Sequence, residues 1–264
     1  SDSSFTTSST LSFNSTSLAI WKVIDNKNYQ GLGLALLRFI INQKKPDLII
    51  AIGLSKMVLP IYKALKFQVG VFSKSALFGS NYKLYNVAKN VPDLNVFNIK
   101  NWDNSDISLF EVSDGILPSY MNECDLDHLF CYHPEKNWEY LVNRYTKANF
   151  YKYYIFIISK KKKAEAIIVF RKVCTENGNI LRISDFQGNK YILKVVRFDL
   201  IEIIDRMNCQ YMDLFQFGID EELLFESGFL STQKYNNLIL PTYFEPFIQE
   251  NRNLDFAYKI YNKK

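Results

Sequence analysis

The sequence predicts an α/β fold with mixed sheets, organised as two similar units in tandem. An apolar, strand-like run at residues 18–24 leads through a polar turn and two glycines into an apolar helix. A second, nearly unbroken apolar run at residues 47–53 is typical of a buried strand, and a helical pattern follows it. Residues 213–229 repeat the order of strand, short helix and Gly-Phe turn in the second half of the chain. We therefore expect the same supersecondary unit to occur twice.

The composition fits one large or two modest hydrophobic cores. The chain has 264 residues, of which 48% are hydrophobic and 16% aromatic, and its formal net charge is +5. The densest basic run, Lys160–Lys163, stands between two strand-like segments, which predicts a solvated hairpin tip rather than a nucleic-acid face. No apolar run approaches the roughly 18 to 20 residues that cross a bilayer. We expect no nucleic-acid partner, no membrane span and no signal peptide.

The cysteines do not predict a metal site. The four cysteines are widely spaced and form no Cys-x-x-Cys pair. Two of them cluster with the two histidines, but their spacing matches no standard zinc finger. The clustered residues are Cys124, His128, Cys131 and His133. We expect reduced thiols in a cytoplasmic protein that holds no metal.

The turn at Gly31 and Gly33 carries the main functional signal. Backbone N–H groups in the first turn of a helix lack an intrahelical acceptor, and the helix dipole adds about half a positive charge there. Glycine has no Cβ to keep a phosphate away from the backbone. A dinucleotide fingerprint would need a third glycine where Leu36 stands, and a P-loop would need Gly-Lys-Ser/Thr. The alternatives are another phosphate seat, or glycines that only ease a tight turn.

Two segments resemble signatures of one family. Residues 30–37, Gln-Gly-Leu-Gly-Leu-Ala-Leu-Leu, resemble the coenzyme A pyrophosphate loop of the GNAT (Gcn5-related N-acetyltransferase-like) superfamily. Residues 61–70 are similar to its second signature, a tyrosine on a helix followed by a Gly-Phe-like turn into a strand. Lys66 stands where that turn usually has glycine. The order of strand, glycine turn, helix, strand, helix and Tyr-Phe is more specific than either signature alone.

The resemblance implies an acyl-CoA-dependent N-acyltransferase with acetyl-CoA as the expected co-substrate. The acceptor would be the amine of a small molecule such as an amino sugar. Tyr62 is the implied general acid toward the thiolate, since a phenol near its ordinary pKa is protonated at pH 7. The alternative for Tyr62 is a ring packed in the core. The implied cofactor-binding residues are Gln30, Gly31, Leu32, Gly33, Leu34, Ala35 and Ser55, and Ser55 is also the expected N-cap of its helix.

The general base stays open. Asp25, Glu111 and Asp114 are candidates by their order along the chain, and His128 and His133 are further candidates. No pattern in the sequence separates them.

We expect a polar tail over residues 1–16, a first unit over 17–104 and a second over 105–264. The family places three strands and two helices before its glycine loop, so the first unit is expected to be N-terminally incomplete. The second unit is expected to be complete, with a hairpin around the lysine run as its early strands. Further expected elements are a strand-like run at 94–99, helices at 138–145, 192–207 and 221–226, a turn at Asn177-Gly178, and strands at 180–186 and 211–217.

The second copy is expected to be degenerate. Its loop keeps one glycine, Gly188, and adds the bulk of Lys190 and Tyr191. Phe225 stands where we expect the counterpart of Tyr62, and it cannot donate a proton. This copy is expected to shape an acceptor pocket at the interface between units. Two other functions stay open: an aminoacyl transferase of the peptidoglycan type, and a non-catalytic binding or scaffold protein.

Overall fold

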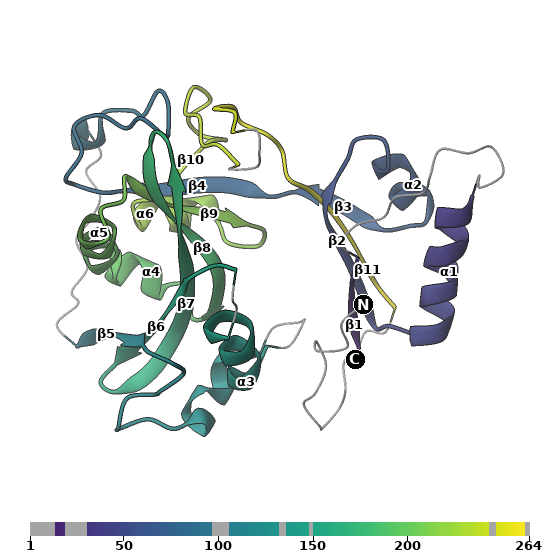
Figure 1. Cartoon of the computed structure of the whole chain (residues 1–264), viewed down its shortest axis with the longest axis horizontal. Helices are drawn as coiled ribbons and strands as arrows, with labels where there is room; N and C mark the ends of the chain where they lie inside the picture. The colour runs from purple at the N-terminus through teal and green to yellow at the C-terminus, as the bar shows by residue number, and fades with distance from the viewer. Residues whose placement is uncertain are drawn as a thin grey trace. The chain divides into compact units, whose positions relative to one another are not determined.

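The computed structural model describes residues 14–18, 31–96, 106–131, 136–147, 150–242 and 247–261. The chain divides into two compact units (Figure 1). The first combines the chain up to Phe72 with the C-terminal residues from Asn253 onward, and the second holds nearly all of the residues between them. The expected unit boundary at residue 104 falls inside the second unit of this division.

Over its described residues, the first unit is a four-stranded mixed sheet with two helices. Its strands lie in the order β1-β2-β11-β3; β1 and β2 are parallel, and β11 is antiparallel to both β2 and β3. The core joins buried residues of β2 and β11 to Tyr62 and Phe67. The elements are β1 (Ser15–Leu18), α1 (Leu32–Lys44), β2 (Leu48–Leu54), α2 (Leu59–Ala64), β3 (Gln68–Val71) and β11 (Asp255–Ile260).

The second unit is built on a seven-stranded sheet in the order β10-β4-β9-β8-β7-β6-β5. Among the described strands of this sheet, only β8 and β9 pair in parallel. The strands are β4 (Ser73–Phe78), β5 (Ile107–Val112), β6 (Tyr153–Lys160), β7 (Lys163–Thr175), β8 (Gly178–Gly188), β9 (Tyr211–Gln216) and β10 (Leu230–Ser231). The α-helices are α3 (Trp138–Leu141), α4 (Ile192–Val195), α5 (Arg197–Arg206) and α6 (Glu221–Glu226). Leu94–Val96 and Glu123–Leu129 are 3₁₀-helical, and Val142–Thr146 is π-helical.

Apolar side chains cover both faces of this sheet. One cluster joins Phe170 and Met212 on the strands to Leu200 of α5 and Leu224 of α6. A second cluster joins β6 and β7 to the 3₁₀-helix Glu123–Leu129 and to α3. A third lies on the other side of β4 and β9. The long apolar runs of β6 and β7 follow from this burial on two sides.

The two sheets contain the same block of strands, and each block takes one strand from a distant part of the chain. In the first unit β1, β2, β11 and β3 are neighbours; in the second, β8, β9, β4 and β10 are neighbours with the same parallel and antiparallel senses. The inserted strand β4 directly follows β3 in the sequence, and β11 is the last strand after β10. Each half of the chain therefore supplies the strand that fills the other half's sheet.

Most expected elements are present. The lysine run forms the β6–β7 turn, with Lys161 and Lys162 at φ 49° and 66°, and Asn177-Gly178 forms the β7–β8 turn. The helix expected at 192–207 is interrupted at Val196. The expected strand at 94–99 is wrong for its described part, which is 3₁₀-helical.

The N-terminal expectations are only partly testable. Ser15 and Thr16, expected in a polar tail, form part of β1 and pair with β2. The expected strand at 18–24 has only Leu18 inside the described residues, where it ends β1. Residues 1–13 and 19–30 lie outside them.

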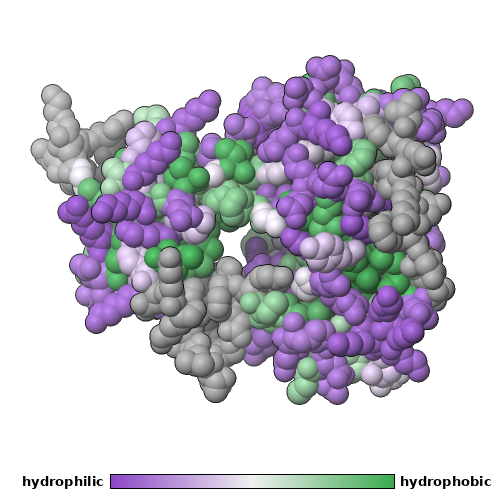
Figure 2. Space-filling model, turned by 180° about the vertical axis from the view of Figure 1, so that it is seen from behind, coloured by the Kyte–Doolittle hydropathy of each residue, from purple (hydrophilic) through white to green (hydrophobic). Residues whose placement is uncertain are grey.

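The surface seen from behind is mainly hydrophilic, with apolar residues between the polar ones (Figure 2). Such scattered exposure is ordinary for a folded chain. Within the described ranges, no helix is both long and apolar enough to cross a membrane.

Candidate functional site

The start of α1 presents an open glycine turn. Gly31 is the N-cap at φ 79°, in the left-handed region that favours glycine. A Cβ built on Gly31 would meet no atom of the described residues within 4 Å, its two chain neighbours aside. The Ala35 N–H donates to the Gly31 carbonyl over 2.9 Å, so the amides of residues 32–34 precede the first intrahelical bond. An anion bound at this turn could accept hydrogen bonds from these three N–H groups.

The helix α1 itself adds a positive potential at this turn. The first turn of α1 holds no acidic residue, Gly31 makes no side-chain cap, and Lys44 is the basic residue of the last turn. Leu32 is 51% exposed, whereas Gly33 is buried. The positive end of the helix dipole is therefore not offset by a carboxylate of the helix itself. Two expected residues, Gln30 and Asp25, lie outside the described ranges.

Ser55 does not cap a helix, so that prediction is wrong. Helix α2 begins at Leu59, with Val58 as its N-cap and proline in its first turn. The Ser55 carbonyl instead accepts the Val58 N–H over 3.1 Å. The fixed φ of Pro60 favours a helix start beside it, so turn residues separate Ser55 from the helix. The role of Ser55 toward a cofactor stays a prediction.

Tyr62 lies in the core of the first unit. It is 2% exposed on α2, and its ring meets the Phe67 ring edge-on with centroids 5.1 Å apart. Burial raises the pKa of the Tyr62 phenol, so it is protonated at neutral pH. The Tyr62 ring is packed in the core, which was the alternative to a catalytic role. The role of Tyr62 as a general acid stays a prediction.

The turn after Tyr62 identifies its counterpart in the second unit. The Phe67 N–H donates to the Tyr62 carbonyl over 3.0 Å, and Lys66 has φ 60°. This is the hydrogen bond of a Schellman turn, with lysine at the left-handed position. The same bond after α6 joins the Phe229 N–H to the Leu224 carbonyl over 2.8 Å, with Gly228 at φ 88°. Leu224 rather than Phe225 is therefore the counterpart of Tyr62, which corrects the register of the sequence comparison.

The corresponding turn of the second unit is closed by its own chain. A Cβ on Gly188 would lie 2.5 Å from the Glu165 carbonyl oxygen. The Asn189 N–H donates to that oxygen over 2.8 Å, and the Asn189 Oδ1 accepts the Tyr191 N–H over 3.1 Å. The donors before α4 are thus used within the unit. The loss of a phosphate seat in the second copy stays a prediction.

Of the expected base candidates inside the described residues, two lie at the end of β5 and one lies in the 3₁₀-helix Glu123–Leu129. Glu111 is on β5, and Asp114 follows that strand. The His128 ring Nε2 is 2.9 Å from the Ala164 carbonyl oxygen. His133 is outside the described residues. In the described ranges, no three or more His, Cys, Asp or Glu side chains are placed to hold a metal ion.

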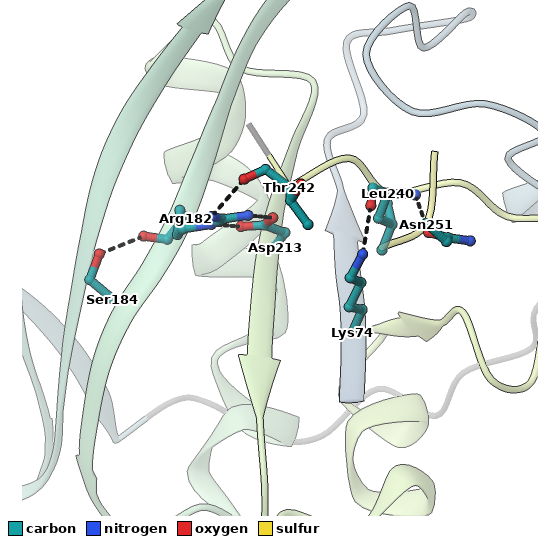
Figure 3. Close-up of polar contacts among 7 residues, drawn as sticks. All are labelled: Lys74, Arg182, Ser184, Asp213, Leu240, Thr242 and Asn251. Carbon is teal, nitrogen blue, oxygen red and sulfur yellow. Dashed lines mark hydrogen bonds and ion pairs between the residues drawn. The ribbon is translucent and has the colours of Figure 1, made fainter. Parts of the chain in front are cut away.

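A buried charged cluster in the second unit was not found from the sequence (Figure 3). Arg182 donates two hydrogen bonds to Asp213, over 3.1 and 2.7 Å, and Nη1 donates to the Thr242 carbonyl over 3.4 Å. Lys74 is 5% exposed and donates to the Leu240 carbonyl over 3.3 Å. Both cations lie over the Phe215 ring, 4.5 Å away for Arg182 and 5.2 Å for Lys74.

Lys74 is the unusual member of this cluster. Burial lowers its pKa to about 8, partly offset by the nearby Asp213 carboxylate. Lys74 and Arg182 each bind a carbonyl of one covering segment, residues 238–242, and Asn251 Oδ1 accepts the Leu240 N–H over 3.0 Å. The only available signal was a lysine inside the strand-like run Ser-Lys-Ser-Ala-Leu-Phe at residues 73–78.

No protein-family model matches the sequence, and no curated protein matches it. Solved structures do. One is a GCN5-related N-acetyltransferase from Anabaena variabilis, with 15% identity, a TM-score of 0.50, and coverage of 89% of this chain and 52% of that one. A second is a tandem GNAT protein from the clavulanic acid biosynthesis pathway, with 10% identity, a TM-score of 0.46, and coverage of 92% of this chain and 74% of that one. A third is a GCN5-related N-acetyltransferase from Sphaerobacter thermophilus, with 8% identity, a TM-score of 0.44, and coverage of 89% of this chain and 70% of that one.

The chain has the GNAT fold, and it spans about half the length of the Anabaena protein. Within this chain, the repeated four-strand block indicates two units of that kind.

Proposed function

We propose that this protein is an acyl-CoA-dependent N-acyltransferase, with acetyl-CoA as its expected acyl donor. The open turn at Gly31 carries the proposal. It offers three first-turn amides, no acidic side chain in the first turn of α1, and a glycine N-cap that meets no side chain of the described residues, whereas the matching turn at Gly188 is filled by its own chain. The fold is one that solved N-acetyltransferases share.

In this proposal the amides of Leu32, Gly33 and Leu34 bind the coenzyme pyrophosphate, and Gly31 and Ala35 flank it. Bound acyl-CoA supplies the thioester. Tyr62, with its pKa raised, keeps the proton that a leaving thiolate would take. Gln30 and Ser55 remain proposed contacts. The acceptor is proposed to be a small amine, such as an amino sugar.

A pair of exposed leucines one helical turn apart tests the coenzyme seat. Leu32→Glu puts a carboxylate beside the diphosphate, although an acidic residue in a first turn favours the helix itself. We expect coenzyme A to bind at least about tenfold more weakly, because a like charge then faces the ligand. The measurement is isothermal titration calorimetry with coenzyme A.

Leu36→Glu is the matched control, since Leu36 is 50% exposed and Leu32 51%. We expect it to leave coenzyme affinity within about twofold, because the charge lies beyond the first turn. Equal losses in the two variants, or no coenzyme binding by the wild-type protein, would remove the seat and favour a non-catalytic binding protein.

Tyr62→Phe tests the proton donor. We expect turnover to fall about a hundredfold while coenzyme affinity stays nearly unchanged, because the ring is kept and only the hydroxyl is lost. Release of free coenzyme A thiol over a panel of small amines measures turnover. Tyr258→Phe in β11 is the matched control, since the Tyr258 hydroxyl donates to the Gln68 side chain. Unchanged turnover in Tyr62→Phe would take Tyr62 out of the mechanism.

A further inference from the structure

The first unit carries an excess of positive charge on the helices that cover its sheet. Ile41 of α1 and Tyr62 of α2 belong to one hydrophobic cluster with β2, so the two helices lie on the same side of the sheet (Figure 1). Residues 31–72 contain a single acidic residue, Asp47, and six cations: Arg38, Lys44, Lys45, Lys56, Lys63 and Lys66. All six cations are exposed, and none forms an ion pair with a described residue.

Helix α1 is apolar on the side that faces water as well as on the side that faces the sheet. Gly33 and Leu37 are buried. Leu32, Leu36 and Phe39 are 51%, 50% and 59% exposed. Their spacing of i, i+4 and i+7 places them in one stripe along the helix. A helix that is apolar all round normally has an apolar contact on both sides, so the outer stripe indicates a binding surface.

The segment that leads into α2 adds to this surface. Met57 is 87% exposed and Ile61 is 43% exposed. Their neighbours Lys56 and Lys63 are exposed cations. We call the exposed side chains of residues 32–45 and 56–66 the α1–α2 face. It combines aliphatic and aromatic side chains with cations, and within these two ranges the sequence has no acidic residue.

This combination favours one kind of partner over two others. A second copy of the chain docked through the same face would bring two sets of like charges together. A nucleic acid would pair with the cations but would leave the aliphatic stripe without an apolar contact. A membrane with anionic lipids offers phosphates to the cations and acyl chains to the apolar side chains. Helix α1 has 13 residues, fewer than the roughly 20 that cross a bilayer, so it would lie along the surface.

We infer that the α1–α2 face binds the surface of a membrane that contains anionic lipids. Leu36, Phe39 and Met57 insert among the acyl chains, and the lysines meet the headgroup phosphates. The inference concerns where the protein binds rather than what it catalyses, and it does not use the amides of the coenzyme seat. It therefore holds or fails separately from the proposed acyltransferase activity.

Vesicle co-sedimentation of the full chain tests the lipid requirement. The probes are vesicles of phosphatidylcholine alone and vesicles in which about 30% of the lipid is phosphatidylglycerol. We expect the anionic vesicles to bind the protein at least about tenfold more tightly than the neutral ones at about 0.1 M salt. Raising the salt should weaken binding, because the lysines act through screened charge.

Phe39→Gln tests the apolar stripe. It removes the most exposed ring of α1 and keeps a good helix former. We expect binding to anionic vesicles to weaken about tenfold, because the inserted ring no longer leaves water. Phe217→Gln is the matched control, since Phe217 is 63% exposed in the second unit and Phe39 is 59% exposed. The control should bind as the wild type does.

A double variant, Lys44→Gln with Lys63→Gln, tests the charge of the face. We expect it to bind anionic vesicles about tenfold more weakly and neutral vesicles as the wild type does, because each lysine near the surface adds electrostatic attraction. Lys160→Gln with Lys163→Gln is the matched control. It removes the same charge from exposed lysines of the second unit and should have little effect on binding.

Four results would overturn the inference: no binding to anionic vesicles, equal binding to both kinds of vesicle, equal losses in Phe39→Gln and Phe217→Gln, or equal losses in the two double variants. Self-association of the chain without vesicle binding, abolished by Phe39→Gln, would assign the face to a second copy instead. Far-UV circular dichroism reports the folding of each variant. A coenzyme A titration of the same samples reports the coenzyme seat independently.

Discussion

The turns before α1 and α4 occupy the same place in two copies of one strand order, yet they differ in what surrounds their donors. At Gly31 no atom of the described residues, chain neighbours aside, lies within 4 Å of a built Cβ, and the amides of residues 32–34 precede the first helical bond. At Gly188 the Glu165 carbonyl and the Asn189 side chain fill the corresponding space. A shared fold therefore does not carry a shared site, because a few side chains decide whether backbone donors face a ligand or the protein.

The turns after α2 and α6 also differ, and here the second unit has the more favourable residue. Gly228 takes the left-handed position of the second unit without a steric penalty, whereas Lys66 takes it in the first unit at φ 60°. The position four residues earlier is Leu224 in the second unit and Tyr62, with its hydroxyl, in the first. The copy with the proposed phosphate seat is thus also the copy that keeps a less favourable turn residue and a buried polar group.

The largest expected effect tests the exchange of strands between the two sheets. Ala257 on β11 and Ala76 on β4 are both 0% exposed. Ala257→Asp puts a carboxylate into the middle of the first sheet, and Ala76→Asp does the same in the second. We expect each to cost about 4 kcal/mol or more, because a buried charge lacks a partner. Amide hydrogen exchange followed by strand is the measurement.

Ala257→Asp should lower the protection of the β2 and β3 amides from hydrogen exchange and leave the β8 and β9 amides protected. Ala76→Asp should have the reverse effect. Ile260→Asp is the control on the same strand, since Ile260 is 46% exposed and its change should cost little. Loss of protection in β8 and β9 on Ala257→Asp would contradict the assignment of β11 to the first sheet.

The next effect comes from Lys74, a buried cation of the second unit. Its pKa in the folded chain is about 8, against 10.5 for an unperturbed lysine. Between these values the unfolded chain binds more protons than the folded one, so the contribution of Lys74 to stability rises with pH. Lys74→Met removes this titration and keeps an unbranched side chain.

We expect the difference in unfolding free energy, wild type minus Lys74→Met, to rise by up to about 3 kcal/mol between pH 8 and pH 10.5. Urea denaturation at a series of pH values measures it. Below pH 8 the difference should be constant. The charged and titratable groups near Lys74 are Asp213, Arg182 and Glu250. Taking the difference from the variant cancels titrations that the two proteins share. A flat difference across the whole range would show that Lys74 is ordinarily solvated.

Local patterns were enough to predict the elements that carry their own signal. Alternating and continuous apolar runs gave the β6–β7 hairpin, and its lysine turn and Asn177-Gly178 turn followed from turn chemistry. The helix Glu221–Glu226 was predicted at its observed bounds. The glycine turn before α1 was also predicted, because glycine beside a helix start is a short-range signal.

The features that the sequence missed depend on contacts between distant residues. The exchange of β4 and β11 cannot be seen in periodicity, because both strands look the same in either sheet. The ion pair of Arg182 and Asp213 joins residues on neighbouring strands, and Lys74 meets Phe215 only through strand register. The expected N-cap at Ser55 was three residues early and the expected counterpart at Phe225 one residue late, since capping and turn register are set by hydrogen bonds rather than by residue type.

The smallest expected effect compares the two left-handed turn residues directly. Lys66→Gly removes a steric cost of about 1–2 kcal/mol, but glycine also loses more conformational entropy on folding, so the net gain should be about 0.5–1 kcal/mol. Gly228→Ala should be destabilising, because its Cβ would lie 2.8 Å from Arg197 Nε and 3.0 Å from Leu77 Cδ1, at φ 88°. Hydrogen exchange of the Phe67 and Phe229 amides, which make the two matching turn bonds, measures each unit separately. If Lys66→Gly weakened the Phe67 amide's protection instead, the lysine side chain would be contributing more through its contacts than its backbone conformation costs.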